Sequence, residues 1–233
     1  MISSQFKILE VWNETADIKS IKVEKDPFFE YKPGQYMMME LEVVDEENGS
    51  IRPLSLASSP TEGFLLFSTK ISQTPFKKEL NTRGKGYAIN LKGPFGVFVL
   101  KEDAKEIMFL GGGIGITPFR DMIKYASDKM LPIKMTLLYS NRTANDICYK
   151  KEWEDWQNQN PNLKVVNTIT DDPNWQGRKG RIDDKLIKEF CSDIDNTIFY
   201  ICGPPGMVSG LSDILKTMDI PQQNIKIEKF AGY

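Results

Sequence analysis

The pattern of hydrophobic positions changes its period near the middle of the chain. In the first part, short segments of β-forming residues are separated by turn signals such as Pro33-Gly34 and Glu62-Gly63. Several short strands at this spacing predict an antiparallel barrel or sandwich. We expect strands over 6–15, 18–25, 35–43, 53–59, 63–71 and 86–93, with one helical turn near 75–80.

After the segment GPFG at 93–96, apolar strand patterns alternate with amphipathic helix patterns. This alternation predicts a parallel sheet with helices on both faces. The expected strands are 106–113, 133–140, 163–170, 196–203 and 225–230, and the expected helices are 116–129, 146–159, 182–191 and 204–218. The sequence therefore predicts two domains, an antiparallel β-barrel over residues 1–101 and an α/β doubly wound parallel sheet over residues 102–233.

The composition narrows the range of partners and cofactors that the chain can use. The 233 residues carry a formal net charge of −2, which argues against a nucleic-acid partner. The sequence has no histidine, so the commonest general base and metal ligand are missing, and we expect a cofactor rather than a metal site to carry the chemistry. Cys148, Cys191 and Cys202 are too few to hold an iron–sulfur cluster that needs four cysteines of this chain.

Neither a membrane span nor a secretory signal is recognisable. No apolar run approaches the roughly 20 residues of a spanning helix, and the N-terminal MISSQFKILEVW has no basic region followed by an apolar core. The sparse, odd number of cysteines suits a reducing compartment. We therefore expect a cytoplasmic protein without membrane insertion.

The strongest motif is a glycine-rich turn between an apolar strand and a helix, GGGIGITP at 111–118. Glycines let the backbone approach a phosphate closely, and a helix N-terminus presents N–H groups and the positive end of its dipole. Thr117 is the expected cap of the helix. The spacing differs from G-x-G-x-x-G, so a turn that only packs the helix on the strand is the alternative.

Two further motifs carry chemistry. CGPPGM at 202–207 also joins an apolar strand to a helix, and two such turns at the carboxyl ends of parallel strands indicate a ligand site. Alone, Cys202 is usually a small buried hydrophobic residue. RPLS at 52–55 places Arg52 at a strand start, where its fork of donors can pair with a phosphate or simply face solvent.

Taken in order, these motifs resemble those of the ferredoxin–NADP(+) reductase superfamily over nearly the whole chain. RPLS is similar to that family's R-x-Y-S flavin motif, GGGIGITPF to its pyrophosphate turn, and CGPPGM to its C-G-x-x-x-M nicotinamide motif. GPFG is similar to the end of its flavin barrel, and the E-x-F at 228–230 to its terminal carboxylate and aromatic. The resemblance implies an FAD-binding barrel followed by an NAD(P)-binding domain, without an iron–sulfur domain.

The resemblance implies a set of FAD contacts in the barrel. Arg52 is implied to bind the FAD pyrophosphate, and Ser55 to lie near flavin N5. Lys77 adds charge at the phosphates or is a solvated helix lysine. Leu54 stands where the family has tyrosine, so another aromatic, Tyr36 or Phe76, is a candidate for stacking. The complete implied set is Arg52, Pro53, Leu54, Ser55, Thr69, Ile71, Thr74, Phe76 and Lys77.

A second implied set concerns the nicotinamide nucleotide. Phe230 covers the flavin or is a core aromatic, and Tyr233 instead or also covers the flavin or the adenine. Arg142 binds the 2′-phosphate of NADP, stacks on adenine or faces solvent; we favour NADP slightly over NAD. The implied nucleotide contacts are Gly112, Gly113, Thr117, Ser140, Arg142, Cys202, Gly203, Met207 and Tyr233, and the implied catalytic residues are Ser55, Cys202, Glu228 and Phe230.

The implied function is an FAD-dependent oxidoreductase that transfers hydride between NAD(P)H and FAD. Because no other redox centre is encoded, the electrons must pass to a separate acceptor, such as ferredoxin or another one-electron carrier protein. Two alternatives remain. The chain is a reductase subunit of a larger redox complex, or it is a non-catalytic nucleotide-binding redox sensor that has lost flavin binding through Leu54.

Overall fold

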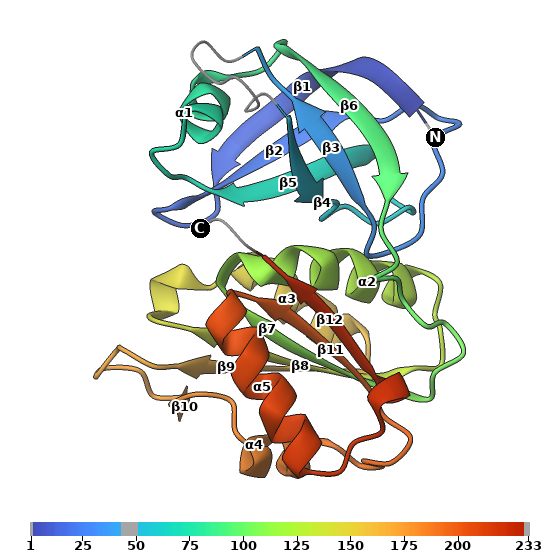
Figure 1. Cartoon of the computed structure of the whole chain (residues 1–233), viewed down its shortest axis with the longest axis vertical. Helices are drawn as coiled ribbons and strands as arrows, with labels where there is room; N and C mark the ends of the chain where they lie inside the picture. The colour runs from blue at the N-terminus through green and yellow to red at the C-terminus, as the bar shows by residue number, and fades with distance from the viewer. Residues whose placement is uncertain (1, 43–50, 231–233) are drawn as a thin grey trace. The chain divides into compact units, whose positions relative to one another are not determined.

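The computed structural model describes residues 2–42 and 51–230 (Figure 1). The chain divides into two compact units, with the boundary after Leu100 and with residues 120–125 of a later helix grouped with the first unit. Each unit has its own sheet. They are described separately below.

The first unit is a nearly closed antiparallel barrel. Its strands, in the order β4-β3-β6-β1-β2-β5, pair antiparallel throughout. Beyond the end of β4, the Ala57 N–H donates to the Leu66 carbonyl of β5 at 2.8 Å, which brings the two ends of the sheet together. The strands are β1 (Ile2–Asn13), β2 (Ile18–Glu24), β3 (Tyr36–Glu40), β4 (Ile51–Ser55), β5 (Phe64–Lys70) and β6 (Ala88–Phe95).

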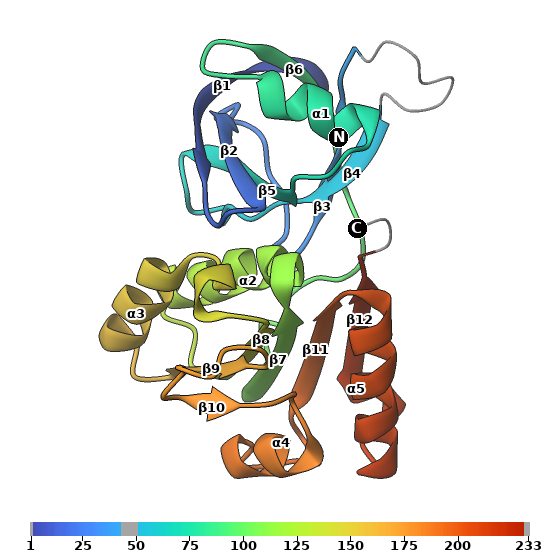
Figure 2. The ribbon, with the colours of Figure 1, turned by 90° about the vertical axis from the view of Figure 1, so that its left-hand side faces the viewer.

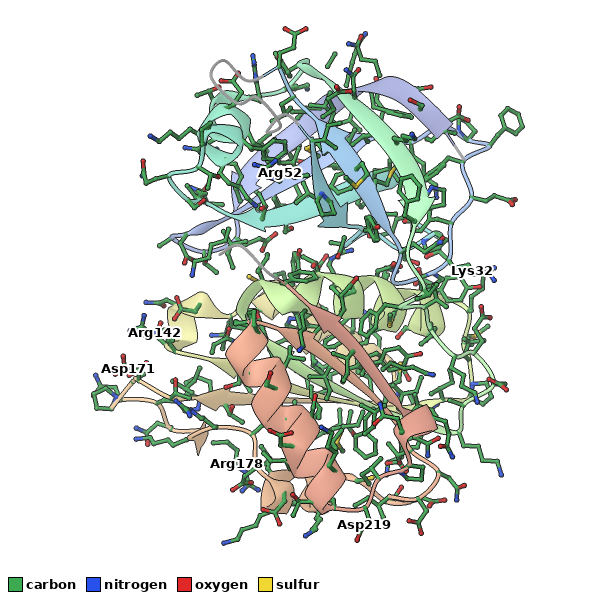
Figure 3. All side chains as sticks on the ribbon, viewed as in Figure 1. Lys32, Arg52, Arg142, Asp171, Arg178 and Asp219 are labelled. Atoms are coloured by element: carbon green, nitrogen blue, oxygen red, sulfur yellow. The ribbon has the colours of Figure 1, made fainter. Side chains whose placement is uncertain are left out.

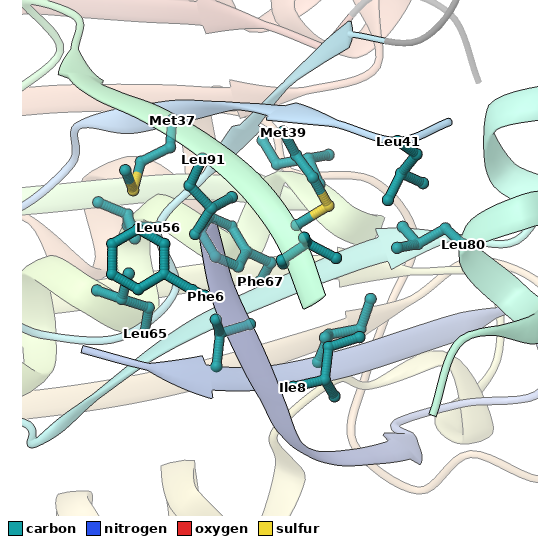
Figure 4. Packing of buried hydrophobic residues seen from close by; sticks show 14 of the residues in the cluster. Phe6, Ile8, Met37, Met39, Leu41, Leu56, Leu65, Phe67, Leu80 and Leu91 are labelled. Atoms are coloured by element: carbon teal, nitrogen blue, oxygen red, sulfur yellow. The ribbon is translucent and has the colours of Figure 1, made fainter. Parts of the chain in front are cut away.

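Alternating side chains of these strands fill the barrel (Figure 4). Met37 and Met39 of β3 are fully buried, as period-two patterning requires, whereas β5 is buried on both of its faces, with Leu65 and Phe67 in the barrel core. The helix α1 (Pro75–Thr82) adds Phe76 to the same cluster. A barrel core of this kind is stabilised by about 1.5–3 kcal/mol for each large apolar side chain removed from water.

The second unit is a parallel sheet in the order β10-β9-β8-β7-β11-β12. The chain starts in the middle at β7, moves outward to β10, and returns to the other side of β7 with β11. The strand order therefore reverses between β7 and β11, which is the topological switch point of a doubly wound sheet. The strands are β7 (Glu106–Gly112), β8 (Lys134–Asn141), β9 (Leu163–Ile169), β10 (Arg178–Lys179), β11 (Ile198–Gly203) and β12 (Ile225–Lys229).

Helices cover both faces of this sheet (Figures 1 and 2). On one face, Leu186 of α4 and Leu211 of α5 share a core cluster with Met108 of β7. On the other face, the ring of Phe109 lies 5.0 Å from that of Phe119 on α2. The helices are α2 (Thr117–Asp128), α3 (Lys150–Gln159), α4 (Asp184–Phe190) and α5 (Pro205–Thr217), with 3₁₀ segments η1 (Gly113–Ile116), η2 (Ala144–Asp146) and η3 (Gln222–Asn224).

The fold class predicted from the sequence is confirmed. The predicted helices and strands differ from the observed ones only locally. The two-residue strand β10 was not expected, because both of its side chains are exposed and give no hydrophobic pattern. The third helix begins at Lys150 rather than at Asp146, since Asp146 instead closes a capping box with Thr143 and Tyr149 has a φ of 56°. Over the described residues, no helix is both long and apolar enough to cross a bilayer.

Candidate functional site

The two glycine turns lie at one edge of the parallel sheet. One follows β7 and the other follows β11, and these strands are neighbours with Gly111 opposite Cys202. The carboxyl ends of both strands therefore meet at the switch point, where doubly wound folds bind their ligands. The sheet thus brings together two motifs that are about ninety residues apart in the sequence.

Glycines lie where the two turns touch. A Cβ at Gly115 would lie 2.5 Å from the Cys202 carbonyl oxygen, and one at Gly112 would lie 2.2 Å from Met207 Sδ. Gly113 is different, because its φ is 51° and a Cβ there would meet nothing within 4 Å. Packing against backbone therefore explains Gly115, and a Cβ at Gly112 would displace the flexible end of Met207, whereas Gly113 supplies a left-handed backbone beside open space, which suits the approach of a ligand.

The helix α2 starts directly after this turn. Thr117 is buried, and its hydroxyl donates to the Ile114 carbonyl at 3.2 Å. It does not cap the helix from outside as expected, because η1 precedes α2 and makes Thr117 its first residue. The first turn of α2 contains no acidic residue, so its dipole remains available to an anion.

Cys202, Gly203 and Met207 form the second turn, and the end of β12 lies beside it. Glu228 is opposite Cys202 in the parallel register, and the Phe230 N–H donates to the Gly203 carbonyl at 3.1 Å. Burial raises the pKa of the Glu228 carboxyl to about 7. The structure therefore gathers five of the implied residues within one unit.

The end of β8 contributes an ion pair. Ser140 is opposite Gly112 in the register with β7, and Arg142 follows two residues later. The guanidinium of Arg142 lies 3.4 Å from Asp171 Oδ2, and both side chains are exposed (Figure 3). The backbone joins the same two residues, because the Asp171 N–H donates to the Arg142 carbonyl at 2.7 Å. Asp171 was not predicted from the sequence, although its place directly after the third parallel strand is visible there.

The first unit contains a second cluster, built on β4, β5 and α1. The guanidinium carbon of Arg52 lies 5.5 Å from the centre of the Phe76 ring. The Lys77 ammonium donates to the Thr69 hydroxyl, so it is not simply a solvated lysine. Burial, and then the charge of Arg52, lower the pKa of Lys77 to about 8. A second cation beside Lys77 makes this position suited to bind an anion.

For the other barrel residues that the resemblance implies, the structure shows burial and packing only. Leu54 is 5% exposed and packs in the barrel core, and Phe76 is fully buried. Tyr36 stays partly exposed, with its ring 5.8 Å from that of Phe95. That Leu54, Tyr36 or Phe76 contacts the flavin ring remains a prediction. Ser55 is 8% exposed, whereas Pro53 and Thr74 are exposed and Ile71 is partly buried.

Two further expectations from the sequence concern Tyr233 and a metal site. Tyr233 lies outside the described residues. Within residues 2–42 and 51–230, no group of three or more Cys, Asp or Glu side chains is arranged to hold a metal ion.

Comparisons with known proteins agree with this arrangement. Residues 109–213 match the family described as the oxidoreductase NAD-binding domain. The chain is 31% identical over 206 residues to a subunit of the Na(+)-translocating NADH-quinone reductase of Methylococcus capsulatus, covering 78% of this chain and 50% of that protein. The corresponding protein of Haemophilus influenzae is 29% identical over 203 residues, covering 78% and 49%. The chain thus spans about half the length of the curated relatives it matches.

Two solved structures share the whole fold. The flavohem-like FAD/NAD-binding domain of nitric oxide dioxygenase from Vibrio cholerae has a TM-score of 0.88 at 21% identity, covering 97% of this chain and 98% of that one. A ferredoxin NADP+ reductase from Neisseria gonorrhoeae, solved with bound FAD and NADP, has a TM-score of 0.84 at 19% identity, covering 97% and 98%. At these identities the likeness concerns the fold.

The contact between the turns gives a prediction for Gly115. Gly115→Ala should lower the free energy of unfolding of the second unit by about 1–3 kcal/mol, because the new methyl group meets backbone atoms that cannot rotate away. Gly210→Ala is the matched control, since a Cβ there meets nothing within 4 Å and alanine stabilises a helix interior by about 0.5–1 kcal/mol. Urea unfolding followed by circular dichroism measures both. Equal stability of the two variants would contradict the packing described.

Proposed function

Because the chain belongs to the ferredoxin–NADP(+) reductase superfamily, we propose that it is a flavoprotein that transfers hydride between NAD(P)H and FAD and passes the electrons to a separate acceptor. The observation that carries the proposal is the pair of glycine turns at the switch point of the second unit. They form a nucleotide site within a segment that matches an oxidoreductase NAD-binding domain.

The chemistry of the second unit fits a dinucleotide. Gly112, Gly113 and Thr117 are proposed to hold the pyrophosphate, because the left-handed Gly113 leaves space beside the N-terminus of α2. Cys202 and Met207 are proposed to wall the nicotinamide, with Glu228 and Phe230 completing the wall from the end of β12. Burial keeps the Cys202 thiol neutral by raising its pKa, so it acts there as an apolar surface rather than as a nucleophile.

The chemistry of the first unit fits a second nucleotide with phosphates. Arg52 and Lys77 are proposed to bind the FAD pyrophosphate, because the two cations lie together on the barrel and an anion offsets their repulsion. Ser55, at the end of β4, is proposed to hydrogen-bond near flavin N5. Bound FAD supplies the ability to accept a hydride and to release electrons singly. The contribution of the protein is to bind and orient, which is consistent with a chain that has no histidine.

The acceptor has two candidates. A ferredoxin or another one-electron carrier protein suits a chain whose redox chemistry resides in two nucleotides. Membership of a larger redox complex is favoured by the curated relatives, each of which is named as one subunit of a Na(+)-translocating NADH-quinone reductase. Both candidates require the same internal hydride transfer.

Anaerobic stopped-flow reduction tests the core of the proposal. The protein reconstituted with FAD should lose its flavin absorbance when mixed with NADH or NADPH, and ferricyanide or a ferredoxin should then restore it. A chain that cannot be reconstituted with FAD, or whose bound flavin neither nucleotide reduces, would show that the hydride-transfer function is wrong.

Lys77 predicts a pH dependence of FAD binding. Its pKa of about 8 lies below the ordinary 10.5, so in the free protein the ammonium loses its proton as the pH rises through about 8. A phosphate group of FAD bound beside Lys77 favours the charged form of this lysine. The affinity for FAD should therefore fall above pH 8, and Lys77→Gln should flatten this dependence and weaken binding at pH 7 by about tenfold.

Lys78→Gln is the matched control for this measurement, because Lys78 is the adjacent lysine of α1 and is exposed. It should leave both the affinity and its pH profile unchanged. Fluorescence titration with FAD between pH 6.5 and 9.5 measures all three proteins. A pH profile that is the same for Lys77→Gln and the wild type would remove Lys77 from the phosphate site.

The choice of nucleotide depends on the pair at the end of β8. Arg142 by itself favours the 2′-phosphate of NADP, as proposed from the sequence. Asp171 lies 3.4 Å from that guanidinium, so it neutralises the cation and presents a carboxylate, which accepts a hydrogen bond from a ribose 2′-hydroxyl and repels a 2′-phosphate. We therefore propose that NADH is preferred to NADPH.

Asp171→Asn tests the nucleotide preference. It should raise the ratio of kcat/KM for NADPH to that for NADH by about two- to fivefold, a modest change because both partners of the pair are exposed. Asp172→Asn removes the same charge from the next residue and should leave the ratio unchanged. If both variants or neither variant shift the ratio, Asp171 does not discriminate between the nucleotides.

A further inference from the structure

The last strand of the parallel sheet leaves one edge open. In the strand order, β12 comes after β11, and among the described residues no strand follows it. The Phe230 N–H donates to the Gly203 carbonyl, so the backbone groups of residues 226 and 228 also point toward β11. Because these directions alternate along a strand, the N–H and C=O groups of Ile227 and Lys229 and the C=O of Ile225 point toward the open edge, while the Ile225 N–H donates to the Gln222 carbonyl within the chain. Open edges of this kind can pair with another strand.

The side chains of β12 divide between its two faces. Ile225, Ile227 and Lys229 line a groove of about 300 Å³ between β12 and α5, together with Asp213 and Lys216 of that helix. Ile227 is 39% exposed at the middle of the strand. Lys226 and Glu228 alternate with these residues and are carried on the opposite face. The open edge is therefore apolar at its centre, and its other face carries Lys226 and Glu228, both partly buried, with Glu228 Oε2 lacking a hydrogen-bond partner among the described residues.

We propose that this edge pairs with β12 of a second copy of the chain, antiparallel and with the two-fold axis at Ile227. In this register Ile227 lies opposite its own counterpart, and Ile225 lies opposite Lys229. The Ile227 pair exchanges two backbone hydrogen bonds, and each Ile225–Lys229 pair makes one, from the Lys229 N–H to the Ile225 carbonyl, which gives roughly four across the edge. The two copies of Ile227 then cover each other on the side of the groove.

The charges on the other face favour a second copy over an unrelated strand. The antiparallel register places Lys226 of each copy opposite Glu228 of the other, whereas a parallel pairing in register would place like charges together. These residues form pairs without backbone hydrogen bonds, in which side chains approach most closely, at about 4.5 Å between Cα atoms. The sequence IKIEK is thus complementary to itself, as an isologous interface requires.

Sedimentation velocity of the full chain tests the proposal. The measurement is made at pH 8.5, above the pKa of about 7 of the Glu228 carboxyl. The wild type should form a reversible dimer at micromolar concentrations. Lys226→Glu and Glu228→Lys should each weaken the dimer about tenfold or more, because two like-charged pairs replace two ion pairs.

Mixing the two variants gives the sharpest result. In the mixed dimer, the new carboxylate at position 226 of one chain faces the new ammonium at position 228 of the other, and the unchanged Lys226 and Glu228 face each other. Dimerisation should therefore return in the mixture to within about threefold of the wild type. Lys129→Glu, at an exposed position beyond the end of α2, makes the same change of charge and should leave the dimer unaltered.

Three results would overturn the proposal. The wild type could remain monomeric at 100 µM, in which case the lysines of β12 protect the edge from pairing. The Lys226→Glu variant could dimerise as tightly as the wild type. The mixture of the two variants, each with a native circular dichroism spectrum, could stay monomeric.

Discussion

The second unit depends on the direct contact between two glycine turns. Gly115 lies against the backbone of Cys202, with no room for a side chain, and Gly112 lies against the end of the Met207 side chain. This contact fixes how the ends of β7 and β11 meet at the switch point. The turn at this edge, where a nucleotide is proposed to bind, is therefore shaped by packing, and the open left-handed Gly113 is the position that packing does not explain.

The first unit differs from the second in its electrostatics. Its barrel carries two neighbouring cations, Arg52 and Lys77, and burial lowers the pKa of the lysine. An anion bound beside both cations is favoured by their charges. In the second unit, the proposed dinucleotide site relies on backbone N–H groups and a helix dipole for the same purpose. The two proposed sites thus use two distinct chemistries for binding phosphate, which fits the proposal that one chain binds two nucleotides.

Much of the fold could be predicted because its signals are local. The change from alternating to helical periods located both sheets, and glycines at 111–115 marked the turn after β7. The site was predicted less completely. Asp171 pairs with Arg142 across twenty-nine residues of sequence, and the burial of Leu54 and the contact of Lys77 with Thr69 depend on how α1 and the strands pack. No local pattern encodes these contacts.

The sequence by itself determined the two-domain fold class, the strand-to-helix turns and the residue types available for chemistry, because hydrophobic period and glycine placement act over a few residues. The tertiary structure alone decided which residues meet. It paired Arg142 with Asp171, placed Lys77 beside Arg52, and left β12 at the end of its sheet with an open edge. Strand order and burial arise from contacts between distant segments, so charge partners, shifted pKa values and free edges become visible only when the chain is folded.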